Sequence, residues 1–85
     1  MWAVIETKQA GKEIRRLPKN IALIYRRLVF DLELEGPHPH GWESKPLRGR
    51  SEISVRLNRE YRVLIEVVEP HLIVVKVAHR KDIYK

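Results

Sequence analysis

The sequence EISVRLNREYRVLIEVVEPHLIVVKVA, residues 52–78, contains three consecutive stretches with the hydrophobic pattern of β-strands. Residues 53–57 alternate between apolar and polar side chains, which is the period of a strand with one buried and one exposed face. Residues 61–68 and 72–78 are dense in Val, Ile and Leu, and Glu69-Pro70 between them provides a turn. These 27 residues therefore predict three neighbouring antiparallel strands.

The residues before this stretch predict one further strand and two helices. Residues 2–7 favour a strand, and residues 9–17 favour a short helix that Pro18 ends. A longer helix follows, capped by Asn20 and ended by Gly36-Pro37. Its apolar residues recur every three or four positions and form one stripe, which consists of Ile21, Ile24, Tyr25, Leu28 and Leu32.

Residues 36 to about 50 are rich in Pro and Gly and are expected to form a connecting loop. The resulting order is β-α-α-β-β-β. It predicts an α+β fold in which two N-terminal helices pack on one face of a small, mainly antiparallel sheet. A chain of 85 residues supports one core, so residues 1–85 are expected to form a single domain.

Composition limits the classes of function. Seventeen Lys and Arg residues against eleven Asp and Glu give a net charge of +6, which favours a polyanionic partner such as nucleic acid, the ribosome or an acidic protein. The chain has no Cys, which excludes disulfides, thiolate nucleophiles and Cys-based zinc sites. His38 and His40 lack a third ligand at recognisable spacing, so no metal site is predicted. No segment resembles a signal peptide or a membrane span, which predicts a cytoplasmic protein.

Pairing the three later strands with apolar residues opposite apolar residues brings cations together on one face. The predicted register puts Arg56 across from Arg62 and Arg62 across from Lys76, with Arg80 two residues further along. These cations repel one another unless an anion such as phosphate lies between them. A slip of one residue would turn the side chains of the last strand over. The alternative is a solvated polar face on which the cations pair with Glu52, Glu60 and Glu66.

Four short motifs occur in order in the second half of the chain. They are KPLRG at 45–49, SVRL at 54–57, YRVL at 61–64 and HRKDIY at 79–84. Together they resemble the successive signatures of the RelE/ParE superfamily of bacterial and archaeal toxins, and in particular its RelE-like branch. The specific resemblance covers residues 45–85, while in residues 1–35 only the β-α-α pattern matches.

The resemblance implies a toxin of a type II toxin–antitoxin system that enters the ribosomal A site, cleaves the mRNA there and so inhibits translation. It implies as partners the ribosome, mRNA and a cognate acidic antitoxin, with a toxin–antitoxin hetero-oligomer and no metal or organic cofactor. Two alternatives remain. One is a ParE-like toxin that inhibits DNA gyrase, and the other is a degenerate member that only binds antitoxin.

The resemblance also implies functional roles for Arg56, Arg62, Arg80 and Tyr84. Ser54 stands where the best-known member of the branch has a second basic residue, and the terminal Arg and Tyr are closer together here, so the division of catalytic roles does not transfer. Five further basic residues in the second half of the chain are expected to bind RNA. They are Lys45, Arg48, Arg50, Lys76 and Lys81.

Metal-free RNA cleavage needs stabilisation of a crowded, negatively charged phosphate and groups that carry protons. Arginines suit the first task, because a guanidinium stays cationic and binds phosphate through two parallel hydrogen bonds. His79 is the candidate acid or base, since histidine exchanges protons near neutral pH, although its alternation with Val75 and Val77 also allows it to face the core. Tyr84 can stack on a base or donate its hydroxyl, or else cover the edge of the core.

The long helix carries more apolar surface than its buried stripe needs. Leu23, Phe30 and Leu34 lie outside the stripe, and Arg26 and Arg27 lie beside them. An acidic amphipathic segment of the antitoxin is expected to bury the apolar residues and to pair with the arginines. The alternative is that Phe30 and Leu34 turn inward and cover the sheet.

Overall fold

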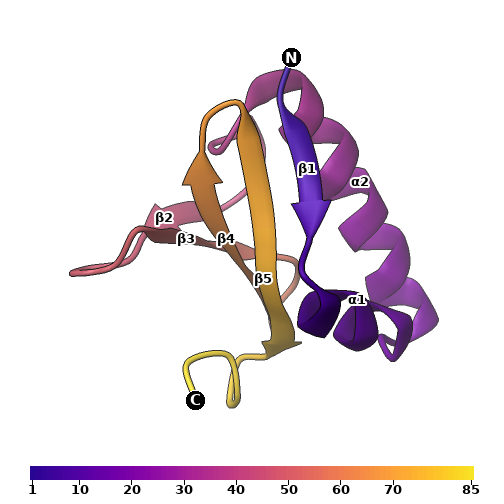
Figure 1. The fold of residues 1–85 in the computed structure, drawn as a ribbon. Helices are drawn as coiled ribbons and strands as arrows, with labels where there is room; N and C mark the ends of the chain where they lie inside the picture. Colours follow the sequence, from indigo (N-terminus) through magenta and orange to yellow (C-terminus); the bar gives the residue numbers. More distant parts are fainter.

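The computed structural model describes residues 1–85 and contains two helices and one five-stranded sheet (Figure 1). The elements are β1 (Ala3–Glu6), α1 (Lys8–Arg15), α2 (Lys19–Glu35), β2 (Ser44–Pro46), β3 (Glu52–Arg56), β4 (Tyr61–Val68) and β5 (His71–His79). The strand order is β1-β5-β4-β3-β2, in which β1 runs parallel to β5 and all other neighbours are antiparallel. The predicted α+β fold with a mainly antiparallel sheet is confirmed. Neither α1 nor α2 has the length and hydrophobicity that a membrane-spanning helix requires.

Helix α1 begins directly after Thr7, whose hydroxyl accepts a hydrogen bond from the Ala10 N–H at 3.1 Å. It ends at Arg15, slightly before the predicted end. The carboxylate of Glu13 accepts a hydrogen bond from the Val77 N–H of β5 at 2.8 Å. Strand β1 no longer runs beside β5 at this point, so α1 satisfies an edge donor that would otherwise be open.

Helix α2 begins after Pro18, which is the N-cap residue in place of the predicted Asn20. The prediction is wrong because Pro18 has extended backbone and its carbonyl already accepts a hydrogen bond from the Ala22 N–H at 2.9 Å. Gly36 ends the helix as predicted, with a φ of 91°. A Cβ at this glycine would lie 2.8 Å from the indole nitrogen of Trp2, so close packing also requires glycine here.

The core lies between α2 and one face of the sheet. Helix α2 buries four residues of the predicted stripe and leaves Ile24 half-buried. The buried residues of the helix are Ile21, Tyr25, Leu28 and Leu32, and those of β3–β5 and the turn after β3 are Ile53, Val55, Leu57, Val63, Ile65, Leu72, Val74 and Val77. The predicted packing of the helices on one face of the sheet is therefore confirmed.

Tyr25 is the polar residue of this helical stripe. Its hydroxyl donates a hydrogen bond to Oε2 of Glu6 in β1 at 2.6 Å. Burial, the hydrogen bond to Glu6 and the negative charge of Glu6 together raise the pKa of Tyr25 well above its usual value. The phenol therefore stays neutral throughout the physiological pH range.

Strand β2 lies within the segment that was predicted to be a loop. Its three residues pair with Val55, Ser54 and Ile53 along the outer edge of β3. The prediction of a loop is therefore wrong for these three residues. So short a strand shows no hydrophobic period in the sequence, because it is stabilised by hydrogen bonds to β3. Pro46 is tolerated because β2 is an edge strand.

The register between β4 and β5 differs from the prediction by two residues. Arg62 lies opposite Ala78, and Lys76 lies opposite Leu64. A β-bulge that adds one residue to β5 before the Ile65–Val74 pair accounts for one residue of this difference, and the pairing of Val68 with His71 at the turn accounts for the other. A shift of two residues preserves the side-chain face. Lys76 therefore lies on the same face as Arg62 but further along the strand.

Candidate active site

Arg56 at the end of β3 and Arg62 near the start of β4 lie directly opposite each other in the antiparallel ladder. The predicted pairing of these two cations is confirmed. Their neighbours Val55 and Val63 belong to the core beneath α2. Side chains alternate between faces along a strand, so both arginines lie on the face of the sheet away from that core.

The half-buried side chain of Arg62 is held by backbone oxygens of the turn between β3 and β4 and of the first residue of β4. Its Nη1 donates to the carbonyl of Asn58 at 3.0 Å and to the carbonyls of Arg59 and Tyr61 at 3.4 Å. No carboxylate lies within ion-pair distance of this guanidinium. The positive charge of Arg62 is therefore fixed in position but not neutralised.

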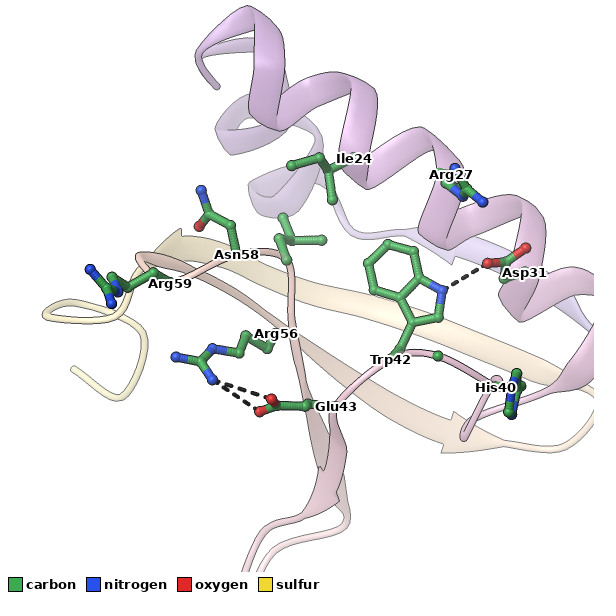
Figure 2. Close-up of a pocket in the computed structure, with 11 residues that line it drawn as sticks. Ile24, Arg27, Asp31, His40, Trp42, Glu43, Arg56, Asn58 and Arg59 are labelled. Carbon is green, nitrogen blue, oxygen red and sulfur yellow. Dashed lines mark hydrogen bonds and ion pairs between the residues drawn. The ribbon is translucent and has the colours of Figure 1, made fainter.

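Arg56 is paired differently. Its Nη1 lies 3.1 Å and 3.3 Å from the two carboxylate oxygens of Glu43, a residue between Trp42 and β2 (Figure 2). The Nε of Arg56 is buried and has no hydrogen-bond acceptor. Sequence reasoning did not identify Glu43, because it belongs to the irregular segment before β2, where no periodic pattern indicates which way a side chain points.

A hollow of about 210 Å³ opens beside the two arginines. Lys45 and Arg48 line it from β2 and the following turn, Arg56 and Arg62 from β3 and β4, and Tyr84 from the C-terminal segment. Glu43 is the one acidic residue in the lining. We call this the basic hollow; four cations against one carboxylate give it a positive potential suited to a phosphate.

Tyr84 is positioned by a small apolar cluster on the same face of the sheet. Ile83 and Leu64 are both almost fully buried although neither belongs to the core beneath α2. The exposed ring of Tyr84 brings its hydroxyl to 3.4 Å from the Ser54 hydroxyl, at the wall of the basic hollow. The burial of Ile83 thus anchors the C-terminal turn and leaves the next side chain at the hollow.

Lys76 and Arg50, both predicted to bind RNA, lie outside the basic hollow. The Nζ of Lys76 donates to the carbonyls of Asp82 and Lys85 at 2.8 Å each, so it holds the C-terminal turn against the sheet. The Nε of Arg50 lies 2.6 Å from Glu52 in an ion pair. Lys76 therefore contacts the backbone on either side of Tyr84 and does not line the hollow itself.

His79 also lies apart from the two arginines. It is paired with Tyr61, and the two rings meet edge to face with centroids 5.6 Å apart. Its Nδ1 accepts a hydrogen bond from the Lys81 N–H at 3.2 Å, and its Nε2 lies 3.7 Å from Glu60. The alternation along β4 and β5 puts Tyr61 and His79 on the opposite face from Arg62.

Arg80 and Lys81 are exposed in the turn after β5, and neither lines the basic hollow. The structure thus brings together five of the predicted site residues, namely Lys45, Arg48, Arg56, Arg62 and Tyr84. It places the other five elsewhere, namely Arg50, Lys76, His79, Arg80 and Lys81.

The outer face of α2 is a separate surface. Leu23, Phe30 and Leu34 are 63%, 60% and 56% exposed, so the alternative in which Phe30 and Leu34 turn inward is wrong. Arg26 and Arg27 are exposed beside them. We call these five residues the α2 outer face.

Protein-family models and curated protein sequences give no match. Solved structures do match. The RelE chain of a RelB–RelE complex from Methanococcus jannaschii has a TM-score of 0.82 at 22% identity, covering 94% of each chain. The archaeal RelE–RelB complex from Pyrococcus horikoshii OT3 gives 0.81 at 23% identity, covering 95% of this chain and 97% of that one.

A third match is the RelBE2 toxin–antitoxin complex from Mycobacterium tuberculosis, with a TM-score of 0.71 at 26% identity, covering 93% of this chain and 98% of the other. The alignments cover nearly the whole length of each chain, so they include most of residues 1–35, where no specific sequence motif was identified. The chain has the RelE-like toxin fold that the four motifs predicted.

Proposed function

We propose that this chain is the toxin of a toxin–antitoxin pair and a ribosome-dependent endoribonuclease that cleaves mRNA in the ribosomal A site. The RelE-like fold is the premise of the proposal. The observation that carries it is the basic hollow, in which the fixed and unneutralised charge of Arg62 lies opposite Arg56 and within the same lining as Tyr84.

The reaction is attack of a ribose 2′-hydroxyl on the neighbouring 3′-phosphate, which forms a 2′,3′-cyclic phosphate as the bond to the 5′-oxygen breaks. The 2′-hydroxyl loses a proton in this step, and the departing 5′-oxygen gains one. In our proposal the phosphate binds in the basic hollow, where Arg62 stabilises the extra negative charge of the transition state. Arg56 binds a second phosphate oxygen, and Lys45 and Arg48 hold the flanking backbone. Tyr84 stacks on an adjacent base or donates its hydroxyl.

Proton transfer needs other groups, because arginines do not release protons at neutral pH. Glu43 is the group in the lining of the basic hollow that is suited to accept the 2′ proton. His79 would have to act from the opposite face of the sheet, and its predicted role as an acid or base stays a prediction. Replacement of each residue by Gln, followed by single-turnover cleavage, distinguishes the two.

The proposed inhibitory partner is an acidic antitoxin that covers the α2 outer face. Three exposed apolar side chains on a helix of a protein this small need a partner to bury them, and the two arginines beside them favour an acidic one. RelE chains of similar fold were solved in complexes with RelB antitoxins, which agrees with such a partner.

The deciding experiment uses purified protein and ribosomes programmed with a defined mRNA, with EDTA-treated protein to test independence of a tightly bound metal. We expect cleavage at the A-site codon, and no cleavage by Arg62→Ala. A parallel assay with DNA gyrase tests the alternative of a ParE-like toxin. Inhibition of supercoiling without mRNA cleavage would reject our proposal in favour of that alternative, and inactivity in both assays would favour a degenerate antitoxin binder.

A further inference from the structure

A larger hollow, of about 520 Å³, lies between α2 and the turn after β3. Trp42, Arg27, Arg56, Asn58 and Arg59 are prominent in its lining, and we call it the tryptophan hollow. Figure 2 shows the Trp42 indole between the two walls, with Arg27 on α2 to one side and Arg56 and Arg59 to the other. The volume lies within the range of small-molecule sites.

Trp42 offers a rigid aromatic surface. Its Nε1 donates a hydrogen bond to Oδ2 of Asp31 at 2.7 Å, and the half-buried ring packs against the core. Ile24 and Leu57 provide the other apolar contacts of the hollow. A fixed ring of this kind loses little conformational entropy when a flat ligand stacks on it.

Polar groups around the ring suit a nucleotide. The exposed Arg27 and Arg59 have no carboxylate within ion-pair distance. The amide oxygen of Asn58 accepts hydrogen bonds from the N–H groups of Glu60 and Tyr61, at 2.9 Å and 2.8 Å. Its amide nitrogen makes no hydrogen bond within the protein, so it is available to donate to the edge of a base.

The two hollows are adjacent, because Arg56 and Glu43 line both of them. A strand of RNA whose phosphate lies against Arg62 can therefore reach the tryptophan hollow by passing Arg56. We infer that the tryptophan hollow binds an unpaired nucleotide of single-stranded RNA adjacent to the bound phosphate, with its base on Trp42 and its phosphate on Arg59. This inference rests on the proposed function of the basic hollow.

A peptide ligand fits the hollow less well. Its lining has only three hydrophobic residues among eleven, whereas the exposed apolar residues of α2 lie outside it. Aromatic stacking combined with guanidinium groups is the usual means of binding unpaired bases without sequence readout. The chemistry of the lining therefore favours RNA over protein.

The test uses Trp42 as its own reporter. A Trp2→Phe variant leaves Trp42 as the single tryptophan, and the probe is a six-nucleotide RNA with methylated 2′-hydroxyls, which cannot be cleaved by the proposed reaction. We expect saturable quenching of Trp42 fluorescence by the RNA. An abasic oligonucleotide of the same length should bind about tenfold more weakly and should not quench. If the Trp2→Phe variant is unstable, calorimetry on the wild-type protein measures the same difference between the two oligonucleotides.

Arg59→Ala gives an independent measurement. We expect a severalfold loss of RNA affinity and a salt slope that is shallower by about 0.7. Arg16→Ala, which removes an exposed cation of the segment after α1, is the matched control and should change the affinity less. Equal affinity for the two oligonucleotides, or equal effects of the two variants, would overturn the inference.

The outcomes separate this inference from the proposed function. If Arg62→Ala abolishes cleavage while the tryptophan hollow shows no base-dependent binding, the nuclease proposal stands and the inference is wrong. If Arg59→Ala weakens binding of the antitoxin but not of RNA, the hollow is a protein site and the inference is again wrong. If wild-type protein binds RNA through Trp42 but does not cleave mRNA on ribosomes, the nuclease proposal fails instead.

Discussion

Both carboxylate oxygens of Glu43 lie within 3.3 Å of a single nitrogen of Arg56, Nη1. The pair differs from a parallel two-nitrogen fork, and it leaves the buried Nε of Arg56 without an acceptor. A phosphate in the basic hollow would therefore compete with Glu43 for a guanidinium that is incompletely satisfied. Binding of RNA is expected to loosen this pair.

Replacing Glu43 by Gln tests this competition. We expect the affinity for uncleavable RNA to rise a few-fold, because an exposed ion pair of this kind stabilises the free protein by about 1 kcal/mol or less. If Glu43 also accepts the 2′ proton, cleavage should fall by about a hundredfold or more although binding improves. Glu52→Gln, which removes a carboxylate outside the hollow, serves as the control. Weaker RNA binding by Glu43→Gln would contradict the competition.

The role of Arg62 is tested by two substitutions. Arg62→Ala should abolish mRNA cleavage, and Arg62→Lys should retain only a small part of it, because Lys keeps the charge but not the planar fork. The stability of both variants should stay within about 1 kcal/mol of wild type, since the side chain packs outside the core. Chemical denaturation checks the fold, and wild-type cleavage by either variant would move the site elsewhere.

Much of this fold was predictable because burial imposes a period on the sequence. Residues 53–57 and the stripe of α2 show the strand and helix periods. The structure buries the apolar Ile53, Val55 and Leu57, and it buries the stripe except for the half-buried Ile24. The bulge in β5 was not predictable. Residues 72–75 are all apolar, so no alternation indicates where an extra residue enters the strand.

The candidate site also contains residues whose positions could be predicted from the sequence and residues whose positions could not. Arg56 and Arg62 could be paired in advance, because a tight connection between two patterned strands fixes which residues face each other. Glu43 and Trp42 could not be placed, since they belong to a segment whose course is set by hydrogen bonds to distant residues, such as the one from Trp42 to Asp31. Lys76 likewise contacts the C-terminal turn through backbone oxygens. Every residue has a backbone oxygen, so the sequence does not reveal which ones Lys76 contacts.

Tyr25 predicts a pH dependence of stability. Its folded pKa is raised, so the neutral form is favoured by the native state, and the stabilisation is fully present below the unfolded pKa of about 10. Above that pH the unfolded tyrosine ionises first, and stability falls. The difference in unfolding free energy between wild type and Tyr25→Phe should shrink above pH 10 by about 1.4 kcal/mol per pH unit. A difference that stays constant up to pH 11 would contradict this account.

Substitution of Lys76 tests whether this residue binds RNA directly or holds the C-terminal turn in position. If it holds the C-terminal turn, Lys76→Met should reduce cleavage and make the C-terminus more sensitive to carboxypeptidase, while the salt slope of RNA binding stays unchanged. A direct phosphate contact would instead make the slope shallower by about 0.7. Lys12→Met, on the exposed side of α1, is the matched control for loss of one charge.

The α2 outer face gives the last prediction. Leu23 and Phe30 are more than half exposed, so replacing both by Ser should cost little stability and leave cleavage by free toxin unchanged. Burying each side chain in a complex is worth roughly 1.5–3 kcal/mol, and losing the exposed part of both should weaken antitoxin binding by at least a hundredfold. Leu28→Ser is the contrasting control, because Leu28 is fully buried and its replacement should destabilise the fold by about 2–5 kcal/mol. Calorimetry with the antitoxin, alongside thermal unfolding of each variant, separates a surface that binds from one that only packs. Undiminished antitoxin binding by the double variant would show that the antitoxin covers another part of the toxin.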